Sequence, residues 1–187
     1  AGTDARRIAD YYAAYMDEAG IEARGLEPLK PELAKIDAIA SKTDLARVLG
    51  SGLRADVDPL NATNYHTENL FGLFVAQGLQ DPGHNIATLM QGGLAMPDRD
   101  YYLKADDAKM AATKAKYEQH VATILQLAGD KDAQAKARGI VAFETELAKV
   151  QWTKVELRDP NKSYNRMDVA QLTALTPGYD WKAALGA

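Results

Sequence analysis

Apolar residues recur along most of this chain at the three- and four-residue spacing of an α-helix. These stripes predict about six to seven helices, which cover residues 4–19, 31–40, 41–50, 106–128 and 130–151 and begin again near residues 168 and 180. The two longest are joined by Gly129-Asp130 and should pack antiparallel. We therefore expect a mainly α fold, a helical bundle-like lobe that forms a single domain over residues 1–187.

The helical stripes also predict what lies inside the fold. The helix at residues 4–19 should end at Gly20, and its apolar residues lie on one stripe: Ile8, Tyr12, Tyr15, Met16 and Ala19. The helix at 130–151 should face the core with Ala133, Ala137, Ile140, Val141, Leu147 and Ala148. Gly139 lies inside the predicted helix at 130–151, where glycine costs up to ~1 kcal/mol relative to alanine. A glycine retained there predicts the close approach of a neighbouring segment.

Residues 71–91 depart from the helical pattern. Two runs that contain apolar residues, 71–80 and 85–91, flank Asp81-Pro82-Gly83. Proline and glycine at the second and third positions of a turn favour type II, in which the third residue has a positive φ. We expect one small antiparallel β-hairpin here, the only sheet of the chain.

The stretch from residue 91 to residue 103 fits neither helix nor strand periodicity. After two glycines it contains Pro97, Asp98, Arg99, Asp100, Tyr101 and Tyr102. Proline fixes its own φ and pushes the preceding residue towards an extended conformation, so we expect an ordered, non-helical connector. Adjacent tyrosines and alternating charges favour a structural corner, with Arg99 paired to a carboxylate and both tyrosines packed inward. A reactive site on the same residues is the alternative.

Glu144 is the one charged residue on the apolar stripe of residues 130–151. A buried carboxylate needs a partner, and Arg158 in the following loop is the first candidate for an ion pair. Asp159 and Pro160 follow Arg158 and should end the helical region. A catalytic role for Glu144 is the alternative, but no nucleophile or second carboxylate accompanies it.

Composition restricts the chemistry that the chain can carry out. Its 187 residues have a net charge of −4 and include no cysteine, which excludes disulfides and thiolate metal sites. His66, His84 and His120 do not form the H-E-x-x-H pair that holds catalytic zinc. Basic residues between 154 and 166 alternate with acidic ones, so we expect no nucleic-acid partner. No apolar run reaches the ~20 residues of a transmembrane segment. We assign no catalytic or metal-binding residue to this chain.

The corner also carries a family resemblance. Gln91-Gly92-Gly93-Leu94, followed by the run from Met96 to Leu103, resembles a signature in the neprilysin and endothelin-converting-enzyme family of zinc metallopeptidases. Weaker matches follow in the same order as in that family: Tyr15-Met16-Asp17, Pro28-Leu29, Phe74-Val75, Glu144 to Ala148, Arg158-Asp159, Tyr164-Asn165 and Asp180-Trp181. The resemblance covers essentially the whole chain and lies in the family's N-terminal, mostly helical region.

The resemblance implies a fragment of the N-terminal cap lobe of a longer zinc metalloendopeptidase that cleaves oligopeptides. In that family the zinc ligands lie in a C-terminal catalytic part, and the helical lobe covers the active site and limits substrate size. The chain alone would then bind no zinc and be inactive, with the C-terminal part and oligopeptide substrates as its partners. The incomplete helix from residue 180 and the lack of cysteine are expected of an excerpt from a bacterial-type member, periplasmic or secreted. A stand-alone helical binding or scaffolding module is the alternative.

Overall fold

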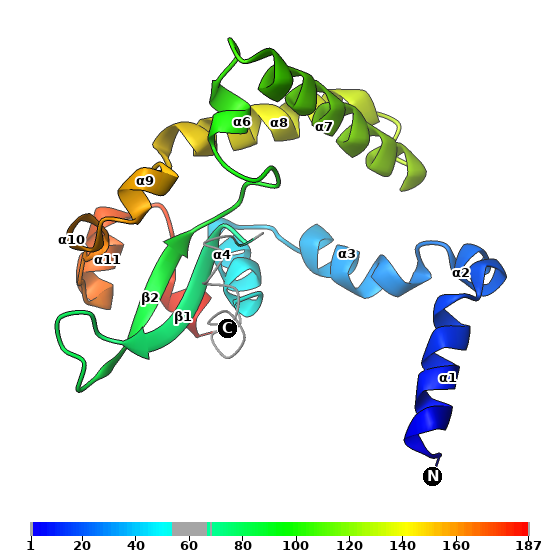
Figure 1. Ribbon diagram of the computed structural model, residues 1–187, viewed down its shortest axis with the longest axis horizontal. Coiled ribbons are helices and arrows are strands. Elements are labelled where there is room, and N and C mark those ends of the chain that lie inside the picture. Colours follow the sequence, from blue (N-terminus) through cyan, green and yellow to red (C-terminus); the bar gives the residue numbers. More distant parts are fainter. Residues whose placement is uncertain (1, 54–66, 68, 187) are drawn as a thin grey trace. The chain divides into compact units, whose positions relative to one another are not determined.

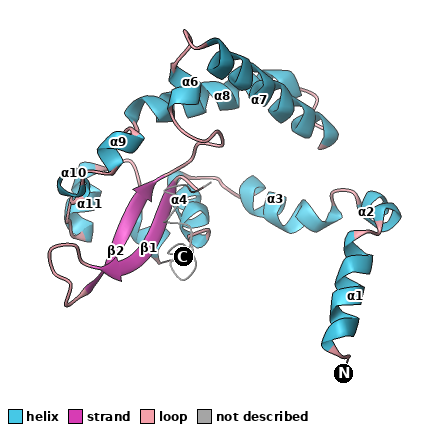
Figure 2. Cartoon of the chain, viewed as in Figure 1, coloured by secondary structure: helices cyan, strands magenta, loops and turns pink. Residues whose placement is uncertain are grey.

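The computed structural model describes residues 2–53, 67 and 69–186 (Figure 1). The described residues form eleven α-helices, one 3₁₀ helix and one two-stranded antiparallel sheet (Figure 2). The predicted mainly α fold with one small hairpin is confirmed. Helices outnumber the six to seven expected because additional short helices form, among them four-residue turns at 100–103, 154–157 and 160–163. Contacts divide the chain into two compact units, Ala1–Ile39 and Ala40–Ala187, and the single domain stays a prediction.

The first unit contains only short helices. They are α1 (Asp4–Tyr15), α2 (Glu18–Arg24), the 3₁₀ helix η1 (Glu27–Leu29) and α3 (Lys30–Asp37). The predicted single helix over residues 4–19 is wrong because Asp17 starts a new one. Its Oδ1 accepts the N–H of Gly20 at 3.0 Å, as an N-cap residue does.

No helix of the first unit has a buried residue. The apolar stripe of α1 is exposed: Ile8 by 71%, Tyr12 by 63% and Tyr15 by 70%. The stripe has the predicted helical spacing, but no described residue of this unit covers it.

The second unit begins with α4 (Lys42–Ser51), which packs against α12 (Trp181–Leu185). The two helices approach closely at Gly50, where a Cβ would lie 2.0 Å from the carbonyl oxygen of Ala184. Three aromatic rings, with centroids between 4.7 and 5.7 Å apart, hold the C-terminal segment against the hairpin: Phe71, Tyr179 and Trp181. Glycine is therefore required where α4 meets α12.

The sheet is the predicted hairpin. Strand β1 (Phe71–Gln77) pairs antiparallel with strand β2 (Asn85–Gln91). The predicted type II turn is wrong because the φ of Gly83 is not positive. The chain nevertheless reverses at this point, and the N–H of His84 donates to the carbonyl oxygen of Asp81 at 3.2 Å.

The two long helices, α7 (Ala108–Leu127) and α8 (Ala133–Val150), form the predicted pair and lie side by side (Figure 1). Gly129, with a φ of 87°, ends the first of them. The buried residues of α8 recur at helical spacing: Ala133, Ala137, Val141, Glu144 and Ala148. The predicted close approach at Gly139 is wrong, since no described atom lies within 4 Å of its Cβ position.

Four short helices complete the second unit: α6 (Asp100–Leu103), α9 (Lys154–Leu157), α10 (Pro160–Ser163) and α11 (Val169–Leu175). The buried core joins the corner to α8 through Leu94, Met96, Tyr102 and Ala148. Among the described residues, no helix combines the length and apolar character needed to cross a bilayer.

Candidate functional site at the corner of residues 91–103

The corner is an ordered reversal of the chain that leads into a helical turn. Gly93 has a φ of 84°, a conformation that favours glycine, and Leu94 and Met96 behind it are buried. Asp98 Oδ1 then accepts the N–H of Asp100 at 2.9 Å, at the start of α6. The predicted non-helical connector is therefore correct up to residue 99 and wrong for residues 100–103, which form a turn of helix.

Two tyrosines hold the buried carboxylate of Glu144, which is 8% exposed. The Tyr102 hydroxyl donates to Glu144 Oε2 at 3.1 Å, and the Tyr117 hydroxyl donates to Oε1 at 3.1 Å. The Tyr102 oxygen also accepts the N–H of Met96 at 3.0 Å, which ties this network to the corner. Burial, followed by the charge of Glu144, raises the pKa of Tyr102 to about 12 and raises the pKa of Tyr117 as well. Both phenols therefore remain hydrogen-bond donors at neutral pH.

The predicted ion pair between Glu144 and Arg158 is wrong. The Arg158 side chain is exposed, and both carboxylate oxygens of Glu144 accept from tyrosines instead. Asp159, next to Arg158, caps α10 by accepting the N–H of Asn161 at 2.9 Å. Neutral donors replace the expected cation because α6 and α7 bring two phenols to the same point on α8. One sign of this arrangement could be read from the sequence, because Tyr117 lies on the apolar stripe of α7.

Arg99 also has a partner other than the predicted carboxylate. Its Nε donates to the carbonyl oxygen of Ala148 at 3.0 Å. The aspartates on either side are already paired with lysines, Asp98 with Lys154 at 3.2 Å and Asp100 with the lysine four residues further on at 2.7 Å. The corner is thus fixed to the C-terminal end of α8 by a guanidinium–carbonyl bond. The predicted inward packing holds for Tyr102, which is buried, and Tyr101 packs against the same core.

Two glutamine side chains connect the corner to the segment after α8. Gln91 Nε2 donates to the carbonyl oxygen of Trp152 at 3.0 Å, and its Oε1 accepts the Trp152 N–H at 2.9 Å. Gln151 Nε2 donates to the carbonyl oxygen of Gly92 at 2.7 Å. Each glutamine side-chain amide thus forms hydrogen bonds with backbone groups of the other segment. Gln91 begins the stretch that the sequence singled out, but neither its bonds to Trp152 nor the role of Gln151 has a local pattern to mark it.

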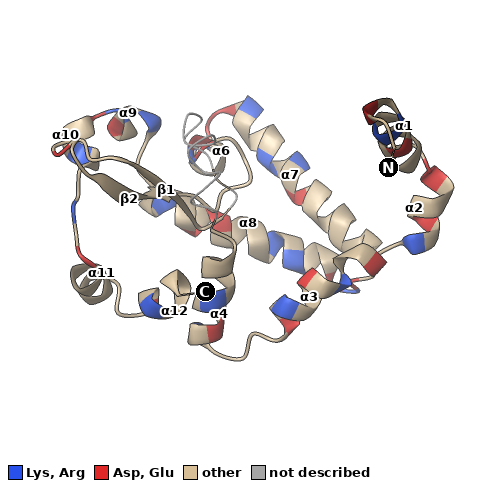
Figure 3. Cartoon of the chain, turned by 90° about the horizontal axis from the view of Figure 1, so that it is seen from below, with Lys and Arg blue, Asp and Glu red and all other residues tan. Residues whose placement is uncertain are grey.

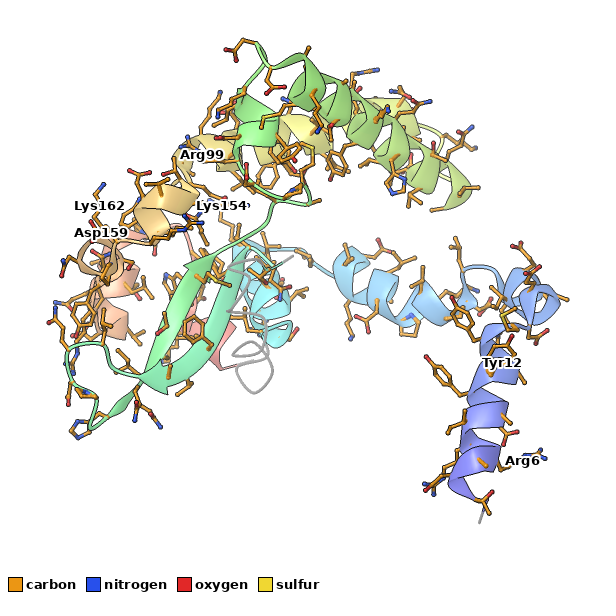
Figure 4. The ribbon with its side chains drawn as sticks, viewed as in Figure 1. Arg6, Tyr12, Arg99, Lys154, Asp159 and Lys162 are labelled. Atoms are coloured by element: carbon orange, nitrogen blue, oxygen red, sulfur yellow. The ribbon has the colours of Figure 1, made fainter. Side chains whose placement is uncertain are left out.

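A cavity of about 200 Å³ lies between the corner and this segment. Its apolar wall includes Leu94, Met96, Pro97, Trp152, Val155 and Leu157. Its charged groups are Asp98, Arg99, Asp100 and Lys154. Figure 4 labels the two cations of the cavity, Arg99 before α6 and Lys154 at the start of α9. The corner residues singled out by sequence thus lie beside residues 151–157, which the sequence did not associate with them.

The described part of the chain has no group of three His, Cys, Asp or Glu side chains that could hold a metal ion. His84 Nδ1 lies 2.9 Å from Asp81 Oδ2 at the exposed hairpin tip, and His120 is exposed on α7. His66 lies outside the described residues. Basic and acidic side chains are interspersed along the helices (Figure 3), and the absence of a nucleic-acid partner stays a prediction.

Known proteins resemble this chain over its full length. The N-terminal model of peptidase family M13 matches residues 1–187. Endothelin-converting enzyme 1 of Bos taurus is 26% identical over 179 residues, which are 94% of this chain and 23% of that protein. The endothelin-converting enzyme homolog of Locusta migratoria is 29% identical over 183 residues, covering 95% of this chain and 24% of that protein.

A solved structure shows the same architecture. The Mycobacterium tuberculosis zinc metalloprotease Zmp1, in complex with an inhibitor, matches 99% of this chain with a TM-score of 0.79 and 34% sequence identity. The match covers 27% of the Zmp1 chain, so this chain spans about a quarter of the length of its relatives. Because the family model matches every residue, the chain belongs to peptidase family M13, the neprilysin and endothelin-converting-enzyme family of zinc metallopeptidases.

Proposed function

We propose that this chain is the N-terminal, helical part of a zinc-dependent metalloendopeptidase that hydrolyses oligopeptides. The observation that carries the proposal is the family match over residues 1–187, together with relatives about four times as long. One of those relatives is named a zinc metalloprotease and others are named endothelin-converting enzymes. A longer polypeptide provides the catalytic part, which is then the principal partner of this chain.

Within that enzyme, the chain contributes to the lobe that covers the active site and restricts the size of its substrates. The exposed apolar side chains of the first unit support this role, because monomeric proteins rarely expose large contiguous apolar surfaces. The second unit supplies rigidity. Its buried Tyr102–Glu144–Tyr117 network and the Gln91 and Gln151 side chains fix the corner to α8.

The chain acts on substrates by position and shape. Zinc in the catalytic part would supply an activated water and polarise the scissile carbonyl. The described residues contain no group of three His, Cys, Asp or Glu side chains that could hold that metal, and in this proposal its ligands belong to the catalytic part. A wall made of packed helices excludes folded proteins sterically, while short peptides enter and leave. Peptide length is therefore the property that this lobe controls.

The test compares the native gene product with the isolated chain of residues 1–187. We expect the native protein to have about four times the mass of this chain and to cleave short peptides in a chelator-sensitive reaction. With a series of unstructured peptides of increasing length, kcat/KM should fall beyond a limiting length. The isolated chain should be inactive. A native mass equal to that of the chain, or cleavage by the chain alone, would contradict the proposal.

A periplasmic or secreted location belongs to the same proposal. It is supported by the family resemblance and is checked by fractionating cells and locating the native protein with an antibody raised against residues 1–187. Recovery of the protein in the cytosolic fraction alone would contradict it.

A further inference from the structure

Arg99 is a half-buried cation whose terminal nitrogens have no partner in the part of the chain that the structure describes. Its Nε donates to the carbonyl oxygen of Ala148, which fixes the plane of the guanidinium. No hydrogen bond or ion pair to either terminal nitrogen is present among the described residues. Removing such a cation from water is costly unless an anion compensates for it. The planar fork of a guanidinium is suited to the two oxygens of a carboxylate.

The neighbouring charges leave a net positive charge at the cavity. Asp98 is neutralised by Lys154 at 3.2 Å, and its Oδ1 also accepts the N–H of Asp100 at 2.9 Å. Asp100 is neutralised by Lys104 at 2.7 Å. With these two pairs balanced, Arg99 is the charge that remains among the described residues of the cavity wall. The cavity therefore attracts one anionic group.

The size and walls of the cavity restrict what that group can be attached to. Its volume of about 200 Å³ is below the ~300–1,000 Å³ of pockets that enclose a drug-sized ligand. The walls beside Arg99 are largely apolar, with Leu94, Met96 and Trp152 among them. A cavity of this kind fits the methylene groups and carboxylate of one side chain or one chain terminus.

The edge of β2 leads directly to this cavity. Gly92 N–H donates to the Leu70 carbonyl oxygen and Gly78 N–H to the His84 carbonyl oxygen, so the backbone groups of Ala87 and Leu89 point away from β1. These groups have no described partner, and both residues are exposed. A free strand edge can bind an extended peptide by adding it as a further strand. Gln91, the last residue of β2, lines the cavity.

We propose that the cavity binds a carboxylate carried by an extended peptide, that Arg99 holds its two oxygens, and that the edge of β2 aligns the peptide backbone. The choice of a peptide rests on the proposed function, in which the peptide is an oligopeptide substrate. Arg99 is then a binding residue with no part in bond cleavage. The binding site is specific for charge, because the amide of glutamine cannot replace a carboxylate beside a guanidinium.

The test follows the Arg99 Nε–H resonance of isotope-labelled chain 1–187 by NMR. The probe is a blocked tetrapeptide of β-branched residues ending in glutamate, and its control is the same peptide ending in glutamine. We expect a saturable shift with the glutamate peptide and at least about tenfold weaker binding of the control. Both Arg99 variants lack this resonance, so their binding is followed by the backbone N–H resonances of Ala87 and Leu89 on β2. By this measure Arg99→Gln should weaken binding about tenfold, and Arg99→Lys should have an intermediate effect. Arg158→Gln is the matched control, because Arg158 is an exposed arginine outside the cavity wall, and it should bind normally.

The two possible sources of the carboxylate are separated by repeating the titration on the native gene product. A resonance that still responds to the peptide identifies the ligand as an added substrate. A resonance that is already displaced from its position in chain 1–187, and that does not respond to the peptide, shows that a carboxylate of the protein itself occupies the cavity, and it overturns the choice of a substrate peptide. Equal binding of both peptides overturns the proposal, as does normal binding by an Arg99→Gln variant with unchanged α7 and α8 resonances. The proposal is also overturned if the Arg99 resonance has the same chemical shift in chain 1–187 and in the native protein and does not respond to the peptide in either. The titration requires no peptidase activity. An inactive native protein would therefore contradict the proposed function without contradicting the carboxylate site.

Discussion

The two units of this chain have the same helical periodicity but differ in what their apolar side chains contact. In Ala1–Ile39 no helix has a buried residue, and Tyr12 on α1 (Figure 4) is 63% exposed. In Ala40–Ala187 the corner packs on α8 and the C-terminal aromatic residues pack on the hairpin. One unit has a core of its own, whereas the other presents an apolar surface.

This difference shows that helical periodicity predicts which face of a helix is apolar but does not predict which residues cover that face. α1 has 12 residues and α2 has 7, lengths at which an isolated helix is marginal in water. Helices of this length are stabilised mainly by packing. Under the proposed function, the remaining polypeptide provides the surface on which the first unit packs.

The largest effect is expected at Gly50 in the second unit. Gly50→Ala would place a Cβ 2.0 Å from the carbonyl oxygen of Ala184, and backbone atoms cannot move aside as a flexible side chain can. We expect the free energy of unfolding to fall by about 3 kcal/mol, measured by urea denaturation. Gly139→Ala is the control, because nothing described lies near its Cβ position in α8. It should stabilise the chain by up to ~1 kcal/mol. Equal effects of the two variants would contradict the close packing of α4 and α12.

The second-largest effect is expected at alkaline pH, where deprotonation of Tyr102 should lower the free energy of unfolding. Its pKa is raised from 10.0 to about 12 in the folded protein, so the folded state holds the proton more tightly than the unfolded state does. The resulting stabilisation is complete below pH 10 and is lost as the pH rises from about 10 to about 12. We expect a loss of about 2 kcal/mol over this interval, measured by urea unfolding at successive pH values.

Tyr102→Phe provides the control for this pH dependence. The variant should be less stable at neutral pH, because Glu144 loses one of its two hydroxyl donors. Its stability should fall less steeply above pH 10, with Tyr117 still contributing in the same direction. A variant that loses stability as steeply as the unaltered chain would show that the alkaline transition does not arise at Tyr102.

Sequence periodicity predicted the elements whose signals are local. The pair α7 and α8, the hairpin and the position of the corner all follow from stripes, turn residues and caps within a few residues of one another. The partner of Glu144 was predicted wrongly because Tyr102 and Tyr117 reach it from two other elements. Charge alone suggested Arg158, and neither its exposure nor the two phenols could be read from spacing.

The cavity could not be predicted for the same reason. Its wall joins the corner to residues 151–157, and Gln91 and Gln151 hold these segments together through backbone groups. Such contacts depend on tertiary packing, which no local pattern encodes. The break between α1 and α2 could have been found, because Asp17 precedes Gly20 by three residues and forms a cap that competes with a continuous helix.

A smaller effect should distinguish helix caps in the two units. Asp168 caps α11 in the second unit, where its side chain accepts the N–H of Gln171 at 2.8 Å. Asp168→Ala should lower the free energy of global unfolding by about 1 kcal/mol. Asp17→Ala removes the equivalent cap of α2. Because the first unit has no core, we expect this change to speed amide hydrogen exchange within α2 without shifting the cooperative transition. A shift of that transition by Asp17→Ala equal to the shift by Asp168→Ala would contradict the difference between the units.

The smallest effect in the isolated chain is expected on the exposed stripe of α1. Tyr12→Ser should change the free energy of unfolding of chain 1–187 by no more than ~0.5 kcal/mol, because the side chain is 63% exposed there. In the native gene product the same change should cost ~3 kcal/mol, the cost of truncating an aromatic residue at a packed site. Arg6→Gln is the control on the same helix, since its side chain is 72% exposed and forms an ion pair with Asp10 at 2.9 Å. It should have little effect in either protein. Thermal unfolding of both proteins measures the contrast. Equal sensitivity to Tyr12→Ser in the two proteins would mean that the remaining polypeptide does not cover α1, and the first unit would then need another partner to account for its apolar surface.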